Sequence, residues 1–154
     1  MESVRKAMII NTKIGDLSLV EEDGILTEVI FGNEIPGDYK IQDTDNLSKT
    51  KIQILEYLDG KRKSFEIEYS LSGTDFQKKV WNALTKIPYG ETRSYKDIAE
   101  YIQNPKAYRA VGGANNKNPI PIIIPWHRVI GASGDLVGFG GGIDIKIKLL
   151  ELEK

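Results

Sequence analysis

Apolar residues in the first part of the chain come in short runs separated by turn signals. The runs lie at 7–11, 17–19 and 25–31, with Gly15-Asp16 and Asp23-Gly24 between them. This pattern predicts a β-meander of about three strands. A stretch rich in Gly, Pro, Asp and Asn follows and predicts a loop up to residue 46.

A helical pattern succeeds this loop. Ile52, Leu55 and Leu58 recur at the spacing of one helix face. We therefore expect a helix over 49–59 that Ser48 caps and Gly60 ends.

The second half of the chain predicts a series of short helices. Ser94, with Asp97 three residues later, forms a capping pattern that starts one of them. Asn104-Pro105 then breaks the chain, and another short helix is predicted over 106–115. Two short helices joined by a tight turn indicate a helix-turn-helix.

Further elements flank this pair of helices. Thr74 is placed to cap a helix over 75–86. Residues 119–125 are predicted to be extended. A last helix begins near residue 143, with Ile143, Ile147 and Leu150 expected to form its packing face.

These elements together predict an α+β fold with two domains. Residues 1–72 form a small antiparallel sheet with a helix, and residues 73–154 form a mainly helical domain of the winged-helix or helix-turn-helix kind. The net charge is −5 in the first range and +4 in the second, although the whole chain carries only −1. A basic half beside an acidic half favours nucleic-acid contact by the basic half.

Composition excludes several kinds of chemistry. The chain has no cysteine and one histidine, His127, so thiolate catalysis, disulfides and cysteine- or multi-histidine-bound metals are excluded. We expect no metal and no cofactor. No apolar run reaches the roughly 18–20 residues that span a bilayer. We therefore expect an intracellular, cytoplasmic or nucleoid-associated protein without membrane contact.

The motifs of the second half occur in an ordered series. They are Ile87-Pro88-Tyr89-Gly90, Ser94-Tyr95, Arg109-Ala110-Val111-Gly112-Gly113-Ala114-Asn115, Asn118-Pro119, Pro125-Trp126-His127-Arg128-Val129 and the glycine-rich 138–142. This series resembles the O6-alkylguanine-DNA alkyltransferase family, also called methylated-DNA–protein-cysteine methyltransferases. Tyr57-Leu58-Asp59-Gly60-Lys61-Arg62 extends the resemblance, more loosely, into the first half.

One departure from this family decides our expectation. The family signature is Pro-Cys-His-Arg-Val, in which the cysteine attacks the alkyl carbon, and Trp126 stands at that position. Indole has no free lone pair for displacement, so we expect no alkyl transfer. Tryptophan there resembles the alkyltransferase-like branch, whose members bind O6-alkylguanine in double-stranded DNA without repairing it. We therefore expect a monomeric, non-enzymatic lesion-binding protein, with nucleotide excision repair proteins as partners.

The resemblance implies roles for individual residues in DNA binding. Tyr95 contacts the flipped nucleotide, and Arg109 fills the space that the extruded base leaves. Gly112 and Gly113 let their helix approach the minor groove, although tight helix–helix packing explains them nearly as well. The residues that line the lesion pocket are Trp126, Val129, Phe139 and Gly140. Phosphate contacts are expected among Arg93, Lys96, Lys106, Lys117 and Lys146.

A second group of residues surrounds the cysteine in the family. His127 matches the family's base, which acts through water. Glu153 matches the carboxylate that orients this base, and Asn118 matches the asparagine that braces the turn. With Trp126 in place we expect all three to be structural. We also expect Arg128 to form a structural hydrogen-bonded pair.

Two other functions stay open at this point. The chain could be a methylated-DNA–protein-cysteine methyltransferase disabled by a cysteine-to-tryptophan change, which its two-domain length favours slightly. It could also be a helix-turn-helix transcription regulator that binds one operator as a dimer. The glycine-rich helix offers few side chains that read base edges, which argues against the regulator.

Overall fold

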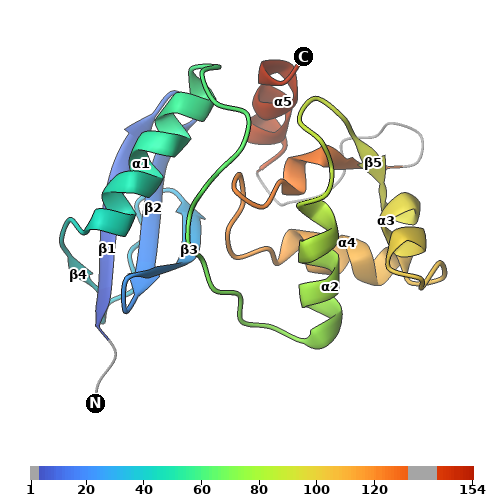
Figure 1. The fold of residues 1–154 in the computed structure, drawn as a ribbon, viewed down its shortest axis with the longest axis horizontal. Coiled ribbons are helices and arrows are strands. Elements are labelled where there is room, and N and C mark those ends of the chain that lie inside the picture. Colours follow the sequence, from blue (N-terminus) through green and yellow to red (C-terminus); the bar gives the residue numbers. More distant parts are fainter. Residues whose placement is uncertain (1–3, 132–141) are drawn as a thin grey trace. The chain divides into compact units, whose positions relative to one another are not determined.

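The structure, a computed structural model, describes residues 4–131 and 142–154 and divides into two compact units, Met1–Ser72 and Gly73–Lys154 (Figure 1). The expected α+β fold class is confirmed. No helix among the described residues is long and apolar enough to cross a membrane.

The first unit is a four-stranded sheet with one helix on it. The expected meander is formed by β1 (Arg5–Thr12), β2 (Gly15–Glu22) and β3 (Ile25–Phe31), all antiparallel. A short β4 (Lys40–Ile41) lies inside the predicted loop and pairs parallel to β1, which gives the strand order β3-β2-β1-β4.

Helix α1 (Asp45–Leu58) contacts β1, β2 and β3 and starts earlier than expected. Its cap is Thr44, whose hydroxyl accepts the Leu47 N–H at 3.1 Å, so Ser48 lies inside the helix. Leu47, Ile54 and Tyr57 are buried. The helical spacing located the helix, but of the predicted stripe only Leu58 is buried and Ile52 is 56% exposed.

The second unit is built on a cluster of three helices. These are α2 (Asp75–Leu84), α3 (Tyr95–Tyr101) and α4 (Tyr108–Asn116), and each contacts the other two. Thr74 and Ser94 both form complete capping boxes, as their sequence patterns predicted. The buried Trp81 of α2 donates its indole N–H to the Ala114 carbonyl of α4 at 2.8 Å.

The remaining elements close the unit around this cluster. A two-stranded parallel pair joins β5 (Arg93–Ser94) to β6 (Val129–Ile130). A 3-10 turn, η1 (Trp126–Arg128), precedes β6, and α5 (Ile143–Leu152) contacts η1. The small sheet and the helical cluster agree with the expected helix-turn-helix type of domain.

Two expectations for this unit are wrong. Residues 119–125 are not extended, because the Ile124 N–H donates to the Ile120 carbonyl at 2.9 Å and Ile122 has a φ of 76°. On α5, Ile143 and Ile147 are 43% and 40% exposed, whereas Lys146 and Leu149 are buried. The helix forms as predicted, but it buries the face that carries Lys146 instead of the face that carries Ile143 and Ile147.

Candidate functional site

Trp126 lies at the start of η1 and is completely buried. The chain reaches it through the tight turn at 120–124. Asn118 braces this turn on both sides, since its Nδ2 donates to the Ile124 carbonyl at 2.8 Å and its Oδ1 accepts the Ile120 N–H at 2.9 Å. The Trp126 N–H then donates to the Ile124 carbonyl at 2.8 Å, so the backbone at position 126 is fixed.

The side chains of His127 and Glu153 meet behind this turn. His127 Nε2 lies 2.8 Å from Glu153 Oε2, and both residues are buried. Burial lowers the pKa of His127 below its ordinary value of 6.5, although the hydrogen bond to Glu153 acts in the opposite sense. The imidazole is therefore neutral at neutral pH. A carboxylate only accepts, so the ring proton sits on Nε2 and Nδ1 is the basic nitrogen.

Glu153 is shared with Arg128. Arg128 Nε donates to Glu153 Oε1 at 2.8 Å and Nη2 donates to Oε2 at 2.9 Å, a bidentate pair. Arg128 Nη1 also donates to the Ile87 carbonyl at 2.8 Å, and the Gly90 N–H donates to Glu153 Oε1 at 3.2 Å. The carboxylate thus joins η1, α5 and the turn after α2. Arg128 takes a structural position, in agreement with the sequence prediction.

Lys146 does not contact phosphate, because it is 1% exposed. Its Nζ donates to the Val129 carbonyl at 2.6 Å. Burial lowers the pKa of Lys146 from 10.5 to about 8. The residue was grouped with surface cations because a lysine at the start of a helix gives no sign in the sequence that its head group is covered.

The exposed face of α4 carries the residues expected to meet DNA. Arg109 and Gly113 are exposed and Gly112 is partly buried. A Cβ added at Gly113 would meet no atom within 4 Å, and one at Gly112 would make only ordinary contacts with the Tyr95 ring, at 3.8 Å and 3.9 Å. Packing inside the described chain therefore does not require either glycine. The space beside both positions leaves room for a partner to approach the helix backbone closely.

Tyr95 lies at the first position of α3, with its ring beside Gly112. Burial raises the pKa of Tyr95, and a hydrogen bond with Asn115 opposes this shift. Asn115 is 1% exposed, and its Nδ2 also donates to the Trp126 carbonyl at 3.4 Å. Sequence reasoning missed this contact, since Asn115 was quoted only as part of a motif.

The remaining predicted residues differ in their burial and in their partners. Val129 is buried beside η1, whereas Phe139 and Gly140 lie outside the described residues. Among the expected phosphate contacts, Arg93 pairs with Glu91 at 3.1 Å, and Lys96 lies 5.7 Å from the centre of the Tyr108 ring. Lys106 and Lys117 are exposed. Trp126, His127, Glu153 and Asn118 are gathered around one turn, while Arg109 and the glycines lie on the outer side of α4.

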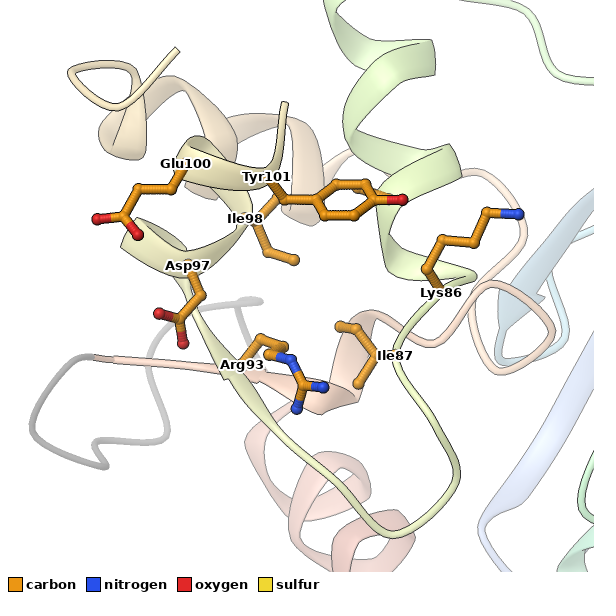
Figure 2. Close-up of a pocket in the computed structure, with 8 residues that line it drawn as sticks. Lys86, Ile87, Arg93, Asp97, Ile98, Glu100 and Tyr101 are labelled. Carbon is orange, nitrogen blue, oxygen red and sulfur yellow. The ribbon is translucent and has the colours of Figure 1, made fainter. Parts of the chain in front are cut away.

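A separate cavity of about 630 Å³ opens between α2, α3 and β5. Figure 2 shows Ile87 and Ile98 facing it, with Asp97 and Glu100 on one side, Lys86 on the opposite side and Arg93 between Asp97 and Ile87. Of the predicted site residues that the structure describes, Arg93 lines this cavity. Its lining carries two cations and two carboxylates and therefore no excess of positive charge that would favour phosphate.

Comparison with known proteins gives consistent results. Residues 75–154 match the family model described as 6-O-methylguanine DNA methyltransferase, DNA binding domain. The chain is 48% identical over 151 residues to the methylated-DNA–protein-cysteine methyltransferase of Methanosarcina mazei, which covers 95% of each chain. The crystal structure of Mycobacterium tuberculosis O6-methylguanine methyltransferase has a TM-score of 0.90 and 47% identity, and covers 97% of this chain and 93% of that one. A structure of M. tuberculosis OGT in complex with DNA has the same TM-score and identity, and covers 97% and 92%.

These relatives contradict the expected non-catalytic lesion-binding function. That expectation rested on Trp126, whereas the similarity spans both units and the relatives are named for methyl transfer to a cysteine. The expectation that the chain is not an enzyme is contradicted by the same relatives, which are named as methyltransferases, although this chain carries Trp126 at the acceptor position. Membership of the alkyltransferase-like branch is not supported, and a link to nucleotide excision repair stays a prediction. The findings favour the alternative of a cysteine-to-tryptophan form of a methyltransferase.

The buried carboxylate of Glu153 gives the first testable prediction. Glu153→Gln removes the negative charge from a buried pair and leaves Arg128 without compensation, so the free energy of unfolding should fall by roughly 3 kcal/mol. Urea unfolding measures this change. Glu151→Gln is the matched control on the same helix, because the Glu151–Lys154 pair is exposed and its loss should cost less than about 1 kcal/mol. Equal losses in the two variants would contradict the assigned role.

Lys146 gives a prediction of pH dependence. Its pKa is about 8 in the folded chain and returns towards 10.5 on unfolding. Between these values the unfolded chain binds a proton that the folded chain has lost, so the free energy of unfolding rises with pH. Urea unfolding of wild type and Lys146→Met at several pH values above and below this window isolates the effect. The stability of wild type relative to the variant should increase with pH, and a constant difference would refute a buried Lys146.

Proposed function

The chain belongs to the family of methylated-DNA–protein-cysteine methyltransferases, and we propose that it is a form of such an enzyme in which Trp126 occupies the position of the methyl-accepting cysteine. One observation supports this most directly. The acid–base pair His127–Glu153 lies directly behind position 126, hydrogen-bonded at 2.8 Å and buried. A base that could activate a thiol is therefore present beside position 126, although the tryptophan at that position has no thiol.

Each neighbour of position 126 has a chemical task once a thiol stands there. Neutral His127 offers Nδ1 as the basic nitrogen, and Glu153 holds the ring by its Nε2–H and would stabilise the positive charge after protonation. The thiolate sulfur would bond to the alkyl carbon while the bond from that carbon to O6 breaks. The electron pair stays on O6, and the released guanine takes up a proton.

Trp126 blocks this chemistry in two ways. The indole has no lone pair for displacement, and its ring is completely buried, so it fills the space beside its own Cβ. The printed sequence has no cysteine at any other position. Cysteine at 126 would supply the nucleophile and, being smaller than tryptophan, room for an alkyl group.

The substrate we propose is double-stranded DNA that carries an O6-alkylguanine. Support comes from the exposed face of α4, where Arg109 and two glycines lie that the chain's own packing does not require. Residues 73–154 carry a net charge of +4, which suits a polyanion. The relative from M. tuberculosis, 47% identical, has been solved in complex with DNA.

The decisive variant is Trp126→Cys. After incubation with a duplex that carries a single O6-methylguanine, we expect intact-protein mass spectrometry to show the gain of one methyl group, because the thiol meets an assembled base. Trp126→Ala removes the same ring without adding a thiol and is the matched control, for which no gain is expected. If folded Trp126→Cys binds the duplex and gains no methyl group, the proposed function is wrong.

Arg109 tests where the DNA lies. Arg109→Ala should weaken duplex binding by about tenfold, in line with the roughly 1–3 kcal/mol typical of an arginine at a DNA interface. Fluorescence anisotropy at several salt concentrations measures this loss. Lys51→Ala is the charge-matched control, since Lys51 is exposed on α1. If Arg109→Ala loses its preference for the lesion while the salt dependence of binding is unchanged, the arginine inserts into the base stack. If Arg109→Ala and Lys51→Ala bind the duplex with equal affinity, the DNA does not bind at α4.

A further inference from the structure

Asn115 is a buried polar residue that takes no part in the proposed methyl transfer itself. It lies in the last turn of α4 and is 1% exposed. Burying an amide is unfavourable unless its polar atoms find partners. Its contacts therefore indicate what the residue is for.

Asn115 bridges two elements that carry predicted site residues. Its Nδ2 donates to the Trp126 carbonyl at 3.4 Å. The Tyr95 ring lies beside Gly112, one helical turn before Asn115 on the same helix, and a side-chain hydrogen bond with Asn115 lowers the pKa of Tyr95. Asn115 thus links the backbone of the acceptor position with the tyrosine at the start of α3.

The oxygen of the same amide makes no matching contact. None of the described residues donates a hydrogen bond to Asn115 Oδ1, although the atom is buried. An amide retained only for stability would be expected to have its oxygen paired as well. Asn118, which braces the neighbouring turn, uses both ends of its amide.

Asn115 lies on the buried side of α4, opposite the side that carries the residues expected to meet DNA. Arg109 and Gly113 are exposed on this helix, whereas Val111, Ala114 and Asn115 are buried. The Trp126 carbonyl also accepts the Val129 N–H that closes η1, so a second donor restricts the peptide plane after residue 126. Orientation of this plane sets the direction in which the side chain of residue 126 leaves the backbone.

We propose that Asn115 is a positioning residue that holds the residue at 126 in register with Tyr95, so that a base presented on α4 meets the acceptor. This inference rests on the proposed function, because the register matters only if position 126 accepts an alkyl group from DNA. Asn115 does not itself touch the reacting atoms. It acts through the carbonyl of residue 126 and through the hydroxyl of Tyr95.

A double-mutant cycle in the Trp126→Cys form tests the inference. The second-order rate constant of methyl transfer from an O6-methylguanine duplex is measured for that form, with Asn115→Leu, with Tyr95→Phe and with both. Each single change should slow transfer by about tenfold, since each removes the same buried hydrogen bond. The double variant should be no more than about twofold slower than the slower single one.

Two controls separate positioning from general damage to the fold. Asn82→Ala removes an exposed asparagine of α2 and should leave the rate unchanged. Asn115→Leu keeps most of the volume, and its thermal unfolding is recorded alongside. Unchanged transfer in folded Asn115→Leu, or losses that multiply in the double variant, would overturn the proposal.

A second readout needs no methyl transfer. In the chain with Trp126, ¹H–¹⁵N NMR spectra are recorded with and without duplex DNA. The amide signals of His127, Arg128 and Val129 should shift on binding, and Asn115→Leu should abolish most of this response while binding persists. An equal response in wild type and variant, or none in wild type, would overturn the proposal. If Trp126→Cys gains no methyl group while the NMR response and its loss in Asn115→Leu are as expected, only the proposed function is refuted.

Discussion

The carboxylate of Glu153 holds the second unit together around position 126. It accepts hydrogen bonds from His127, from two nitrogens of Arg128 and from the Gly90 backbone, at 2.8 to 3.2 Å. A buried charge of this kind is costly to desolvate and is stable only when its partners are all in place. Residues far apart in the sequence therefore have to meet at one point, and the position of η1 follows from that constraint.

Three members of the framework around Trp126 form buried hydrogen bonds. The bracing contacts of Asn118, the His127–Glu153 pair and the Lys146 contact to the Val129 carbonyl are all made around a fully buried indole. Chemistry and scaffold are therefore separable here. The scaffold sets the geometry of the backbone at 126 and the protonation state of His127, and only the side chain at 126 decides whether a nucleophile is present.

Helix α4 connects this scaffold to the surface. Its buried side supplies the Ala114 carbonyl to Trp81 and the Asn115 amide to Trp126, and its exposed side carries Arg109 and Gly113. Glycine in a helix costs roughly 0.8–1 kcal/mol relative to alanine. No packing contact among the described residues requires that cost at Gly113, whereas the inner face of the helix is tightly packed.

The sequence by itself determined the elements whose signals are local. Turn residues and alternating apolar runs predicted the meander, and the Thr74 and Ser94 caps placed α2 and α3 because a capping box involves only residues three apart. The ordered motifs identified the family, but the function inferred from Trp126 alone was wrong. Only the tertiary structure decided that Lys146 is buried, that Ile143 and Ile147 are exposed, that 119–125 turns back, and that Asn115 reaches both Tyr95 and Trp126. These outcomes depend on which helix face meets η1, and that choice is made by contacts between residues distant in sequence, which a local pattern does not contain.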